Sequence, residues 1–281
     1  MEHFICPVCG ENLILGDKVY ECINHHTYNL AKSGYVNLLR SQRSSEKRHG
    51  DDKMMIRARS AFLEKGHYAP LLEGIVAECD RLQVKMLHLT DIGCGEGWYT
   101  DKIFTHLREN GHIVQIEGID ISKDAVSAAA KRNPYIAAAV ASVACLPIKS
   151  ESCDMLLNLF APFDVGEFAR ILKSGGIWLK AIPLERHLYG LKAAIYDNPY
   201  ENKVAVEQYE GFELVRRTDI RDKLTLRGED ISNLFRMTPY FYKTSAADQQ
   251  KLENAEVLET EIEFAILIYQ KKSFHHRETT K

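Results

Sequence analysis

Apolar runs and amphipathic stretches alternate along most of this chain. The apolar runs predict strands at Met86–Ile92, Ile113–Ile119, Tyr135–Ala141, Asp154–Phe160 and Ile177–Ile182. The amphipathic stretches predict helices at Gly97–Arg108, Ser122–Arg132 and Asp164–Leu172, the second with Ser122 as its N-cap. Strands that alternate with helices of about ten residues are typical of parallel β-α-β units. We therefore expect an α/β domain built on a mostly parallel sheet.

Three zones of the chain differ in composition. Residues 1–39 are rich in cysteine and histidine, and residues 40–60 are polar and basic, with seven positive against three negative side chains. Residues 61–281 hold the predicted strands and helices. In this zone Gly175 and Gly176 are expected to end a helix, and Val257–Gln270 predicts one or two strands, antiparallel at the sheet edge. The zones indicate a small module, a basic linker and one large domain.

Composition narrows the classes of function. The chain has 281 residues and a net charge of −3 at pH 7, so it does not hold nucleic acid by bulk charge. Contact with nucleic acid must come from a local basic stretch such as Arg40–Arg59. The sequence shows neither a signal peptide nor the roughly 18 apolar residues of a membrane span. We expect a cytoplasmic protein without a membrane segment, whose cysteines are ligands or buried thiols.

Two closely spaced pairs of metal-binding side chains occur near the N-terminus. Cys6 and Cys9 form a C-x2-C pair, and after twelve residues Cys22 and then His26 follow. A C-x2-C turn places two thiolates at neighbouring corners of a tetrahedron, and a second pair completes it. A module this small cannot bury enough surface to fold alone, so the metal would stabilise it. The spacing favours structural zinc over a lone redox pair, with His25 as an alternative fourth ligand.

The clearest motif is the segment Asp91-Ile-Gly93-Cys-Gly95-Glu-Gly97, which lies where a strand ends and a helix begins. Its glycines allow the backbone to turn sharply and approach a ligand. The G-x-G-x-G spacing differs from the G-x-G-x-x-G of dinucleotide enzymes. The acidic Asp91 suits a ligand with an amino group. These features predict a site for S-adenosylmethionine in a class I, Rossmann-like methyltransferase.

Two positions after the following strands extend this predicted site. Asp120 ends the second strand, where a carboxylate can accept hydrogen bonds from ribose hydroxyls. Ser142 follows the third strand and is expected near the adenine. Many methyltransferases have aspartate at this position, so Ser142 departs from the usual residue.

The zinc spacing and the glycine loop occur together in few families. The sequence closely resembles the 23S rRNA guanine-N1 methyltransferases of the RlmA type over nearly the whole chain. Besides the two motifs, the resemblance is carried by residues 29–38, 62–68, 160–162, 186–188 and 237–239. It implies His26 as the fourth zinc ligand. It also implies that Tyr68, Gly95, Glu96 and His187 contact the cofactor.

Membership of this family implies methylation of N1 of one guanine in the hairpin loop of helix 35 of 23S rRNA. Nucleotides 745 and 748 are the targets of two sister subgroups, and Asn158–Pro162 with Gly166–Phe168 resembles the subgroup of 748. Guanine N1 must lose a proton, so a base would help. The catalytic base stays unknown, with Asp164 and Glu167 as candidates, together with His67 and His187. Phe160 or Phe163 could stack on the base.

Other functions remain open at this stage. The zinc module and the basic stretch Arg40–Arg59 are expected to hold the RNA backbone, with a solvated linker as the alternative. Arg216, Arg217, Arg221 and Lys223 form a second basic cluster. A methyltransferase that acts on a small molecule, or an inactive zinc-ribbon assembly factor, would share the same motifs. The sequence does not determine the oligomeric state, and a homodimer around the RNA hairpin is one arrangement kept open.

Overall fold

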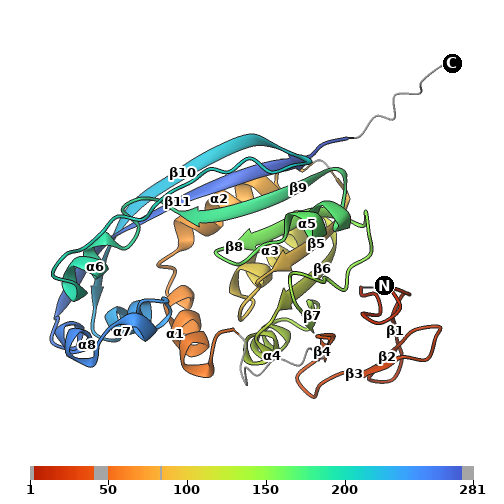
Figure 1. Cartoon of the computed structure of the whole chain (residues 1–281), viewed down its shortest axis with the longest axis horizontal. Coiled ribbons are helices and arrows are strands. Elements are labelled where there is room, and N and C mark those ends of the chain that lie inside the picture. Colours follow the sequence, from red (N-terminus) through yellow and green to blue (C-terminus); the bar gives the residue numbers. More distant parts are fainter. Residues whose placement is uncertain (1–2, 41–49, 83, 274–281) are drawn as a thin grey trace.

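The computed structural model describes residues 3–40, 50–82 and 84–273 of the chain. Within them an N-terminal module holds a small antiparallel sheet of β1 (Ile14–Leu15), β2 (Val19–Glu21) and β3 (Thr27–Asn29). The rest of the described chain forms an eight-stranded sheet covered by helices (Figure 1). The predicted α/β fold with a separate N-terminal module is confirmed.

The order of strands in the large sheet is β10-β11-β9-β8-β5-β6-β7-β4. The strands are β4 (Tyr35–Asn37), β5 (Met86–Ile92), β6 (Ile113–Asp120), β7 (Ala137–Val140), β8 (Cys153–Leu159), β9 (Leu172–Pro183), β10 (Phe212–Arg227) and β11 (Val257–Lys271). The pairs from β4 to β9 are parallel, and β11 pairs antiparallel with both β9 and β10. The carboxyl ends of β5, β6, β7 and β8 therefore meet at one edge of the sheet.

Helices cover the sheet on both faces. They are α1 (Lys53–Glu64), α2 (Ala69–Cys79), α3 (Trp98–Glu109), α4 (Lys123–Arg132), α5 (Val165–Ile171), α6 (Tyr189–Ile195), α7 (Glu229–Arg236) and α8 (Ala246–Glu253), with a 3-10 turn at Phe241–Lys243. Buried residues of α1, α2 and α3 pack with Leu87 and Leu89 of β5 on one face. Buried residues of α5 and of the N-terminal module pack with Ile92 on the other. None of the described helices has the length and apolar character needed to cross a bilayer.

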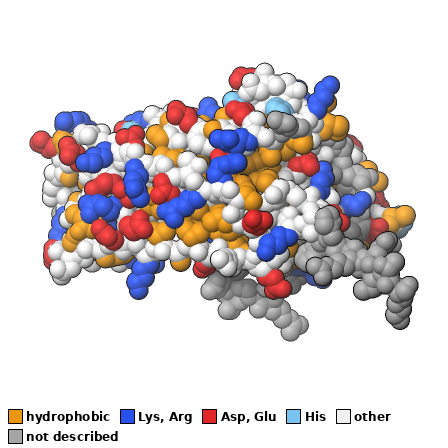
Figure 2. Space-filling model, turned by 90° about the horizontal axis from the view of Figure 1, so that it is seen from above, with side chains coloured by type: hydrophobic (Ala, Val, Ile, Leu, Met, Phe, Trp, Pro, Cys, Tyr) orange, Lys and Arg blue, Asp and Glu red, His pale blue; other side chains and the backbone are white. Residues whose placement is uncertain are grey.

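The structure differs from the sequence-based expectation at the end of the chain. Val257–Lys271 is one strand, and it lies inside the sheet because β10, a strand that the sequence analysis did not predict, covers it at the edge. β10 has no continuous apolar run, because most of its side chains are exposed. Viewed from the β10 side of the molecule, Lys and Arg side chains intermingle with Asp and Glu (Figure 2).

Gly175 and Gly176 do not end a helix, contrary to the expectation from the sequence. Helix α5 ends at Ile171, and Leu172 is already extended. The two glycines lie within β9, where the pairing with β8 skips from Leu172 to Ile177. Gly175 has a φ of 74°, so it allows the irregular backbone of this bulge rather than a helix end.

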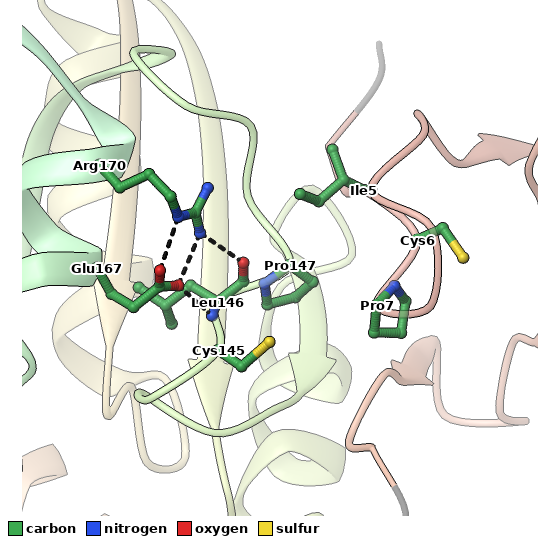
Figure 3. A pocket seen from close by; sticks show the side chains of 9 residues that line it. Ile5, Cys6, Pro7, Cys145, Leu146, Pro147, Glu167 and Arg170 are labelled. Atoms are coloured by element: carbon green, nitrogen blue, oxygen red, sulfur yellow. Dashed lines mark hydrogen bonds and ion pairs between the residues drawn. The ribbon is translucent and has the colours of Figure 1, made fainter.

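The N-terminal module rests on the face of the sheet that carries α5. The amide of Ile5 donates a hydrogen bond of 2.9 Å to the carbonyl of Pro147. Figure 3 shows the crevice beside this contact, which is lined by Ile5, Cys6 and Pro7 of the module and by Leu146 and Pro147 of the domain. Residues 35–37, which the sequence assigns to the zinc module, form β4 and pair with β7 of the large sheet. The module and the domain are thus joined both by packing and by a shared sheet.

Candidate cofactor site and zinc centre

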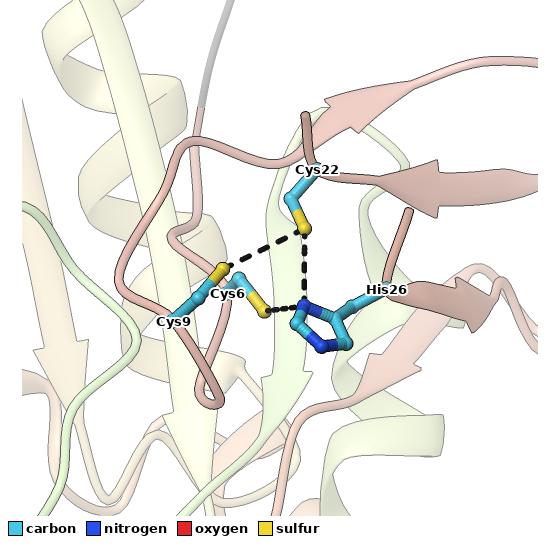
Figure 4. A group of neighbouring side chains, drawn as sticks. All are labelled: Cys6, Cys9, Cys22 and His26. Carbon is cyan, nitrogen blue, oxygen red and sulfur yellow. Dashed lines mark hydrogen bonds between the residues drawn. The ribbon is translucent and has the colours of Figure 1, made fainter. Parts of the chain in front are cut away.

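Four side chains of the N-terminal module converge on one point (Figure 4). The ligand atoms of Cys6, Cys9, Cys22 and His26 lie within 4.8 Å of one another. The Cys9 and Cys22 sulfurs are 3.7 Å apart, and Nδ1 of His26 lies 3.4 Å from the Cys22 sulfur. A tetrahedral zinc ion with Zn–S bonds of about 2.3 Å holds neighbouring ligand atoms roughly 3.5–3.8 Å apart. This set of four side chains therefore fits a structural zinc ion.

The structure separates the two histidines that the sequence left in competition. His25 is exposed, and its Nδ1 lies 2.8 Å from Oε1 of Glu21. His26 instead turns its Nδ1 toward the cysteines. The hydroxyl of Tyr28 contacts the Cys6 sulfur at 3.2 Å, which is the kind of outer contact that orients a metal ligand.

The glycine loop follows β5 at the carboxyl edge of the sheet. Gly93, Gly95 and Gly97 have φ values of 82°, 56° and 77°, a region that other residues rarely adopt. A Cβ atom on Gly93 would lie 2.2 Å from Cβ of Ala161, which belongs to the loop after β8. Glycine at position 93 is therefore required both by the backbone and by the neighbouring loop.

Asp91, at the end of β5, is almost completely buried. Its Oδ2 accepts a hydrogen bond of 2.6 Å from the hydroxyl of Thr100, while its Oδ1 has no partner. Oε2 of Glu96 and Oδ1 of Asn158, both on buried side chains, also lack a hydrogen-bond partner. Buried acceptors are normally satisfied, so these atoms indicate a place where a ligand donates hydrogen bonds.

Asp120 and Ser142 lie at the ends of the next two strands. Asp120 accepts hydrogen bonds from the amides of Gly95, over 3.1 Å, and Ser122, over 2.8 Å. These bonds tie the end of β6 to the glycine loop. Ser142 follows Ala141, whose amide donates to the carbonyl of Asp120. The structure thus places the two positions that the sequence proposed for ribose and adenine at the ends of neighbouring strands.

The pKa values of three carboxyl groups in this site are raised. Burial raises the pKa of Asp91 to about 7, and the nearby charges of Asp120 and Glu96 add to the effect. Burial also raises the pKa of Glu96 and that of Asp120. Several buried acids that resist ionisation indicate a site suited to a cation. The sulfonium and ammonium groups of S-adenosylmethionine meet this requirement.

Tyr68 and His187, the two aromatic residues that the family resemblance assigns to the cofactor, lie beside one another. Their ring centroids are 6.0 Å apart, and both rings contact Phe264. Nδ1 of His187 accepts the backbone N–H of Glu263, so the proton of the neutral ring is on Nε2. Burial lowers the pKa of His187 to about 3. His187 is therefore a hydrogen-bond donor rather than a general base.

The other candidates for a catalytic base already have structural partners. Oδ1 of Asp164 accepts the amide of Glu167 and caps α5. Glu167 forms a double hydrogen bond with Arg170 beside the N-terminal module, as Figure 3 shows. His67 packs on Phe62 and lies 3.3 Å from Asp230.

The loop after β8 distinguishes the two phenylalanines proposed for stacking. Phe160 has a φ of 58° and remains 46% exposed. Phe163 packs against Trp178 and Tyr209, and the ammonium group of Lys180 lies 3.9 Å from its ring centre. A strained, exposed aromatic residue at the carboxyl edge favours Phe160 for contact with a base.

Arg59 belongs to this site, although its place in the sequence indicated only one basic residue of the stretch from Arg40 to Arg59. The structure places its guanidinium 3.6 Å from Glu96 and 2.6 Å from Asp51. A signal was present, because Arg59 is four residues after Met55 and three before Phe62, both buried on α1. Residues 41–49 of the same stretch lie outside the described residues.

Comparisons with known proteins find two matching family models and several similar proteins. Residues 4–47 match the model of the RlmA N-terminal zinc ribbon, and residues 89–176 match that of a methyltransferase domain. A Streptomyces fradiae relative, named 23S rRNA (guanine(748)-N(1))-methyltransferase, is 33% identical and covers 83% of this chain and 84% of its own. YxjB of Bacillus subtilis is 29% identical over 94% and 96% of the two chains. The solved structure of Bacillus subtilis YcgJ shares 14% identity and a TM-score of 0.46, over 74% of this chain and all of its own.

The fold and the site define a class I methyltransferase that uses S-adenosylmethionine and carries an N-terminal zinc ribbon. Its buried acids suit the cofactor, and its four-ligand cluster suits the zinc. With the Streptomyces fradiae relative matched over most of both chains, the protein belongs to the family of 23S rRNA (guanine-N1-)-methyltransferases of the RlmA type.

Proposed function

We propose that this protein methylates N1 of a guanine in 23S rRNA, in the hairpin loop of helix 35 and at nucleotide 748 rather than 745. The observation that carries the proposal is the zinc ribbon packed on the same sheet that holds the acidic cofactor site. The Streptomyces fradiae relative is named for nucleotide 748, which supports the finer assignment. The segments Asn158–Pro162 and Gly166–Phe168 resemble that subgroup.

We assign cofactor binding to nine residues of the glycine loop, of the neighbouring strand ends and of the aromatic pair Tyr68 and His187. They are Tyr68, Asp91, Gly93, Gly95, Glu96, Gly97, Asp120, Ser142 and His187. S-adenosylmethionine supplies an activated methyl group on a sulfonium centre. The residues of this chain orient that donor and exclude water, and the four zinc ligands Cys6, Cys9, Cys22 and His26 hold the ribbon together.

On the acceptor side, Phe160 is the residue we propose to stack on the target guanine. A base in a hairpin loop is already partly unstacked, so presenting it costs less than opening a helix. The side-chain amide of Asn158 donates to the carbonyls of Ala161 and Pro162 and holds the loop that carries Phe160. Asp164 and Glu167 then have structural roles. Asp164 caps α5, and Glu167 accepts hydrogen bonds from Arg170.

RNA contact is assigned to residues 1–39 and to the basic stretch 40–60, ahead of the domain of residues 61–281. The second basic cluster, on β10, is less suited to contact with RNA. Arg216 pairs with Glu78, and Arg217 and Arg221 both pair with Asp219. These ion pairs offset part of the positive charge that the cluster could offer to phosphates. A homodimer that encloses the hairpin remains part of the proposal.

Primer extension across helix 35 tests the proposal, because a methyl on N1 blocks base pairing and stops the polymerase. Cells that lack the gene should lose a stop at nucleotide 748, and the wild-type gene should restore it while the Asp91→Asn variant does not. A stop at 745 would correct the nucleotide. Unchanged N1-methylguanosine with intact cofactor binding would point to a small-molecule substrate, and absence of cofactor binding to an assembly factor.

A further inference from the structure

The guanidinium of Arg59 lies beside the glycine loop, among the acids of the cofactor site. Its Nη1 is 3.6 Å from Oε2 of Glu96 and 3.3 Å from where a Cβ of Gly95 would lie. Only 23% of the Arg59 side chain is exposed. A cation this close to a ligand-binding turn can contact any anionic group bound there.

The chain holds Arg59 in this position from two sides. Nη2 of Arg59 lies 2.6 Å from Oδ2 of Asp51. The backbone carbonyl of Asp51 accepts a hydrogen bond of 2.7 Å from the hydroxyl of Ser122, the N-cap of α4. The adjacent Asp52 caps α1 itself. The guanidinium is therefore anchored to the end of β6 before any ligand binds.

Polar atoms of Glu96, which faces Arg59, and of residues near Glu96 lack hydrogen-bond partners. Oε2 of the buried Glu96 has no hydrogen bond, because its distance of 3.6 Å to Arg59 is too long for one. Oδ1 of Asp91 and the hydroxyl oxygen of Tyr99 are likewise buried without a hydrogen-bond partner. One fixed cation next to unsatisfied carboxylate oxygens is complementary to a zwitterion, whose carboxylate and ammonium groups lie side by side.

We propose that Arg59 binds the α-carboxylate of the methionine part of S-adenosylmethionine, while Asp91 and Glu96 face its α-ammonium group. The inference rests on the proposed function only in taking S-adenosylmethionine as the cofactor. It requires nothing of the RNA substrate. Arg59, the last basic residue of the stretch 40–60, would thus bind the cofactor. Any RNA contact would come from the other basic residues of that stretch.

Calorimetry with two ligands tests this role. S-adenosylmethionine and its decarboxylated analogue differ only in the group that Arg59 would bind. Arg59→Met should weaken binding of the first by about 10- to 100-fold, as expected for a charge-assisted pair, and change the second by less than about twofold. Arg59→Lys should fall between. Arg57→Met is the matched control, since Arg57 is an exposed arginine of the same helix, and it should alter neither affinity.

Three results would overturn the inference. Equal loss for both ligands would make Arg59 a structural residue, and tighter binding by Arg59→Met would make it a competitor of the cofactor. Wild-type protein that binds both ligands equally would also exclude the role, and this comparison needs no variant to fold. Zinc content and thermal denaturation check that each variant is intact. If wild-type protein prefers S-adenosylmethionine to the decarboxylated analogue but does not methylate rRNA, the proposed substrate is wrong and the role of Arg59 stands.

Discussion

The hydroxyl of Thr100 donates a hydrogen bond of 2.6 Å to Asp91 and joins the end of β5 to the first turn of α3. This bond favours the ionised carboxylate, but burial outweighs it and sets the pKa of Asp91 at about 7. Asp91 is therefore close to half-protonated at neutral pH. In the proposed cofactor site, only the ionised form of Asp91 would attract the ammonium group of the cofactor.

Cofactor affinity should consequently rise with pH. A group with a raised pKa is protonated below that value, so binding should improve by up to about tenfold per pH unit below 7 and level off above it. Thr100→Val should move the midpoint to higher pH, because it removes the hydrogen bond that lowers the pKa. Calorimetry between pH 5.5 and 8.5 measures the profile; an unchanged slope in Asp91→Asn would show that another group is responsible.

Gly93→Ala should abolish cofactor binding, because the added methyl group would displace the loop after β8 or the glycine loop itself. The new methyl group would overlap Ala161, and the left-handed backbone adds about 1–2 kcal/mol of strain. Gly111→Ala is the matched control, because Gly111 has a φ of 81° with nothing within 4 Å of the added carbon. Thermal denaturation and calorimetry should show a small loss of stability in the control and full cofactor affinity. Equal behaviour of the two variants would refute the clash.

Removal of one zinc ligand should affect the ribbon before the cofactor site. Cys9→Ser is expected to release the metal and destabilise residues 1–39, with cofactor affinity mostly retained. Cys145→Ser provides a control, since Cys145 is an exposed thiol in the crevice next to the ribbon. Zinc content by mass spectrometry and limited proteolysis report the two effects. A matching loss of cofactor affinity would mean that the ribbon and the domain are energetically coupled.

Glu117 should make stability depend on pH through its contacts with His3 and His88. The carboxylate is fully buried, 2.8 Å from Nδ1 of His3 and 2.6 Å from Nε2 of His88. Burial would raise the pKa of Glu117, but the hydrogen bonds of both histidines lower it to about 2. Burial would lower the pKa of His88, and the hydrogen bond and charge of Glu117 raise it instead.

Both pKa shifts make the free energy of unfolding depend on pH. The contribution of Glu117 is complete above its unfolded pKa of 4.5 and is lost as the pH falls toward 2. That of His88 is complete below its unfolded pKa of 6.5 and is lost as the pH rises through its higher folded value. Glu117→Gln should cost about 3–5 kcal/mol between pH 5 and 6 and flatten the profile, whereas the exposed Glu109→Gln should cost under about 0.5 kcal/mol. Urea unfolding measures both; parallel profiles for wild type and Glu117→Gln would disprove the assignment.

Features that depend on neighbours in sequence were predictable. Cys6 and Cys9 are three residues apart, Ser122 caps the helix that follows it, and the glycines of the loop act on the turn in which they lie. In each case local backbone geometry decides the outcome. The strands β5, β6 and β8 were predictable for a related reason, since each holds several buried apolar residues within seven or eight positions.

Other features required the fold. The sequence alone established a zinc ribbon, a parallel sheet and a glycine loop flanked by acids, because short-range spacing encodes each of them. Only the tertiary structure decided that β10 covers β11, that His3 meets Glu117 across 114 positions, and that Arg59 faces Glu96. Such contacts join segments far apart in the chain. Their partners follow from how the layers pack, and no local pattern of residues specifies that packing.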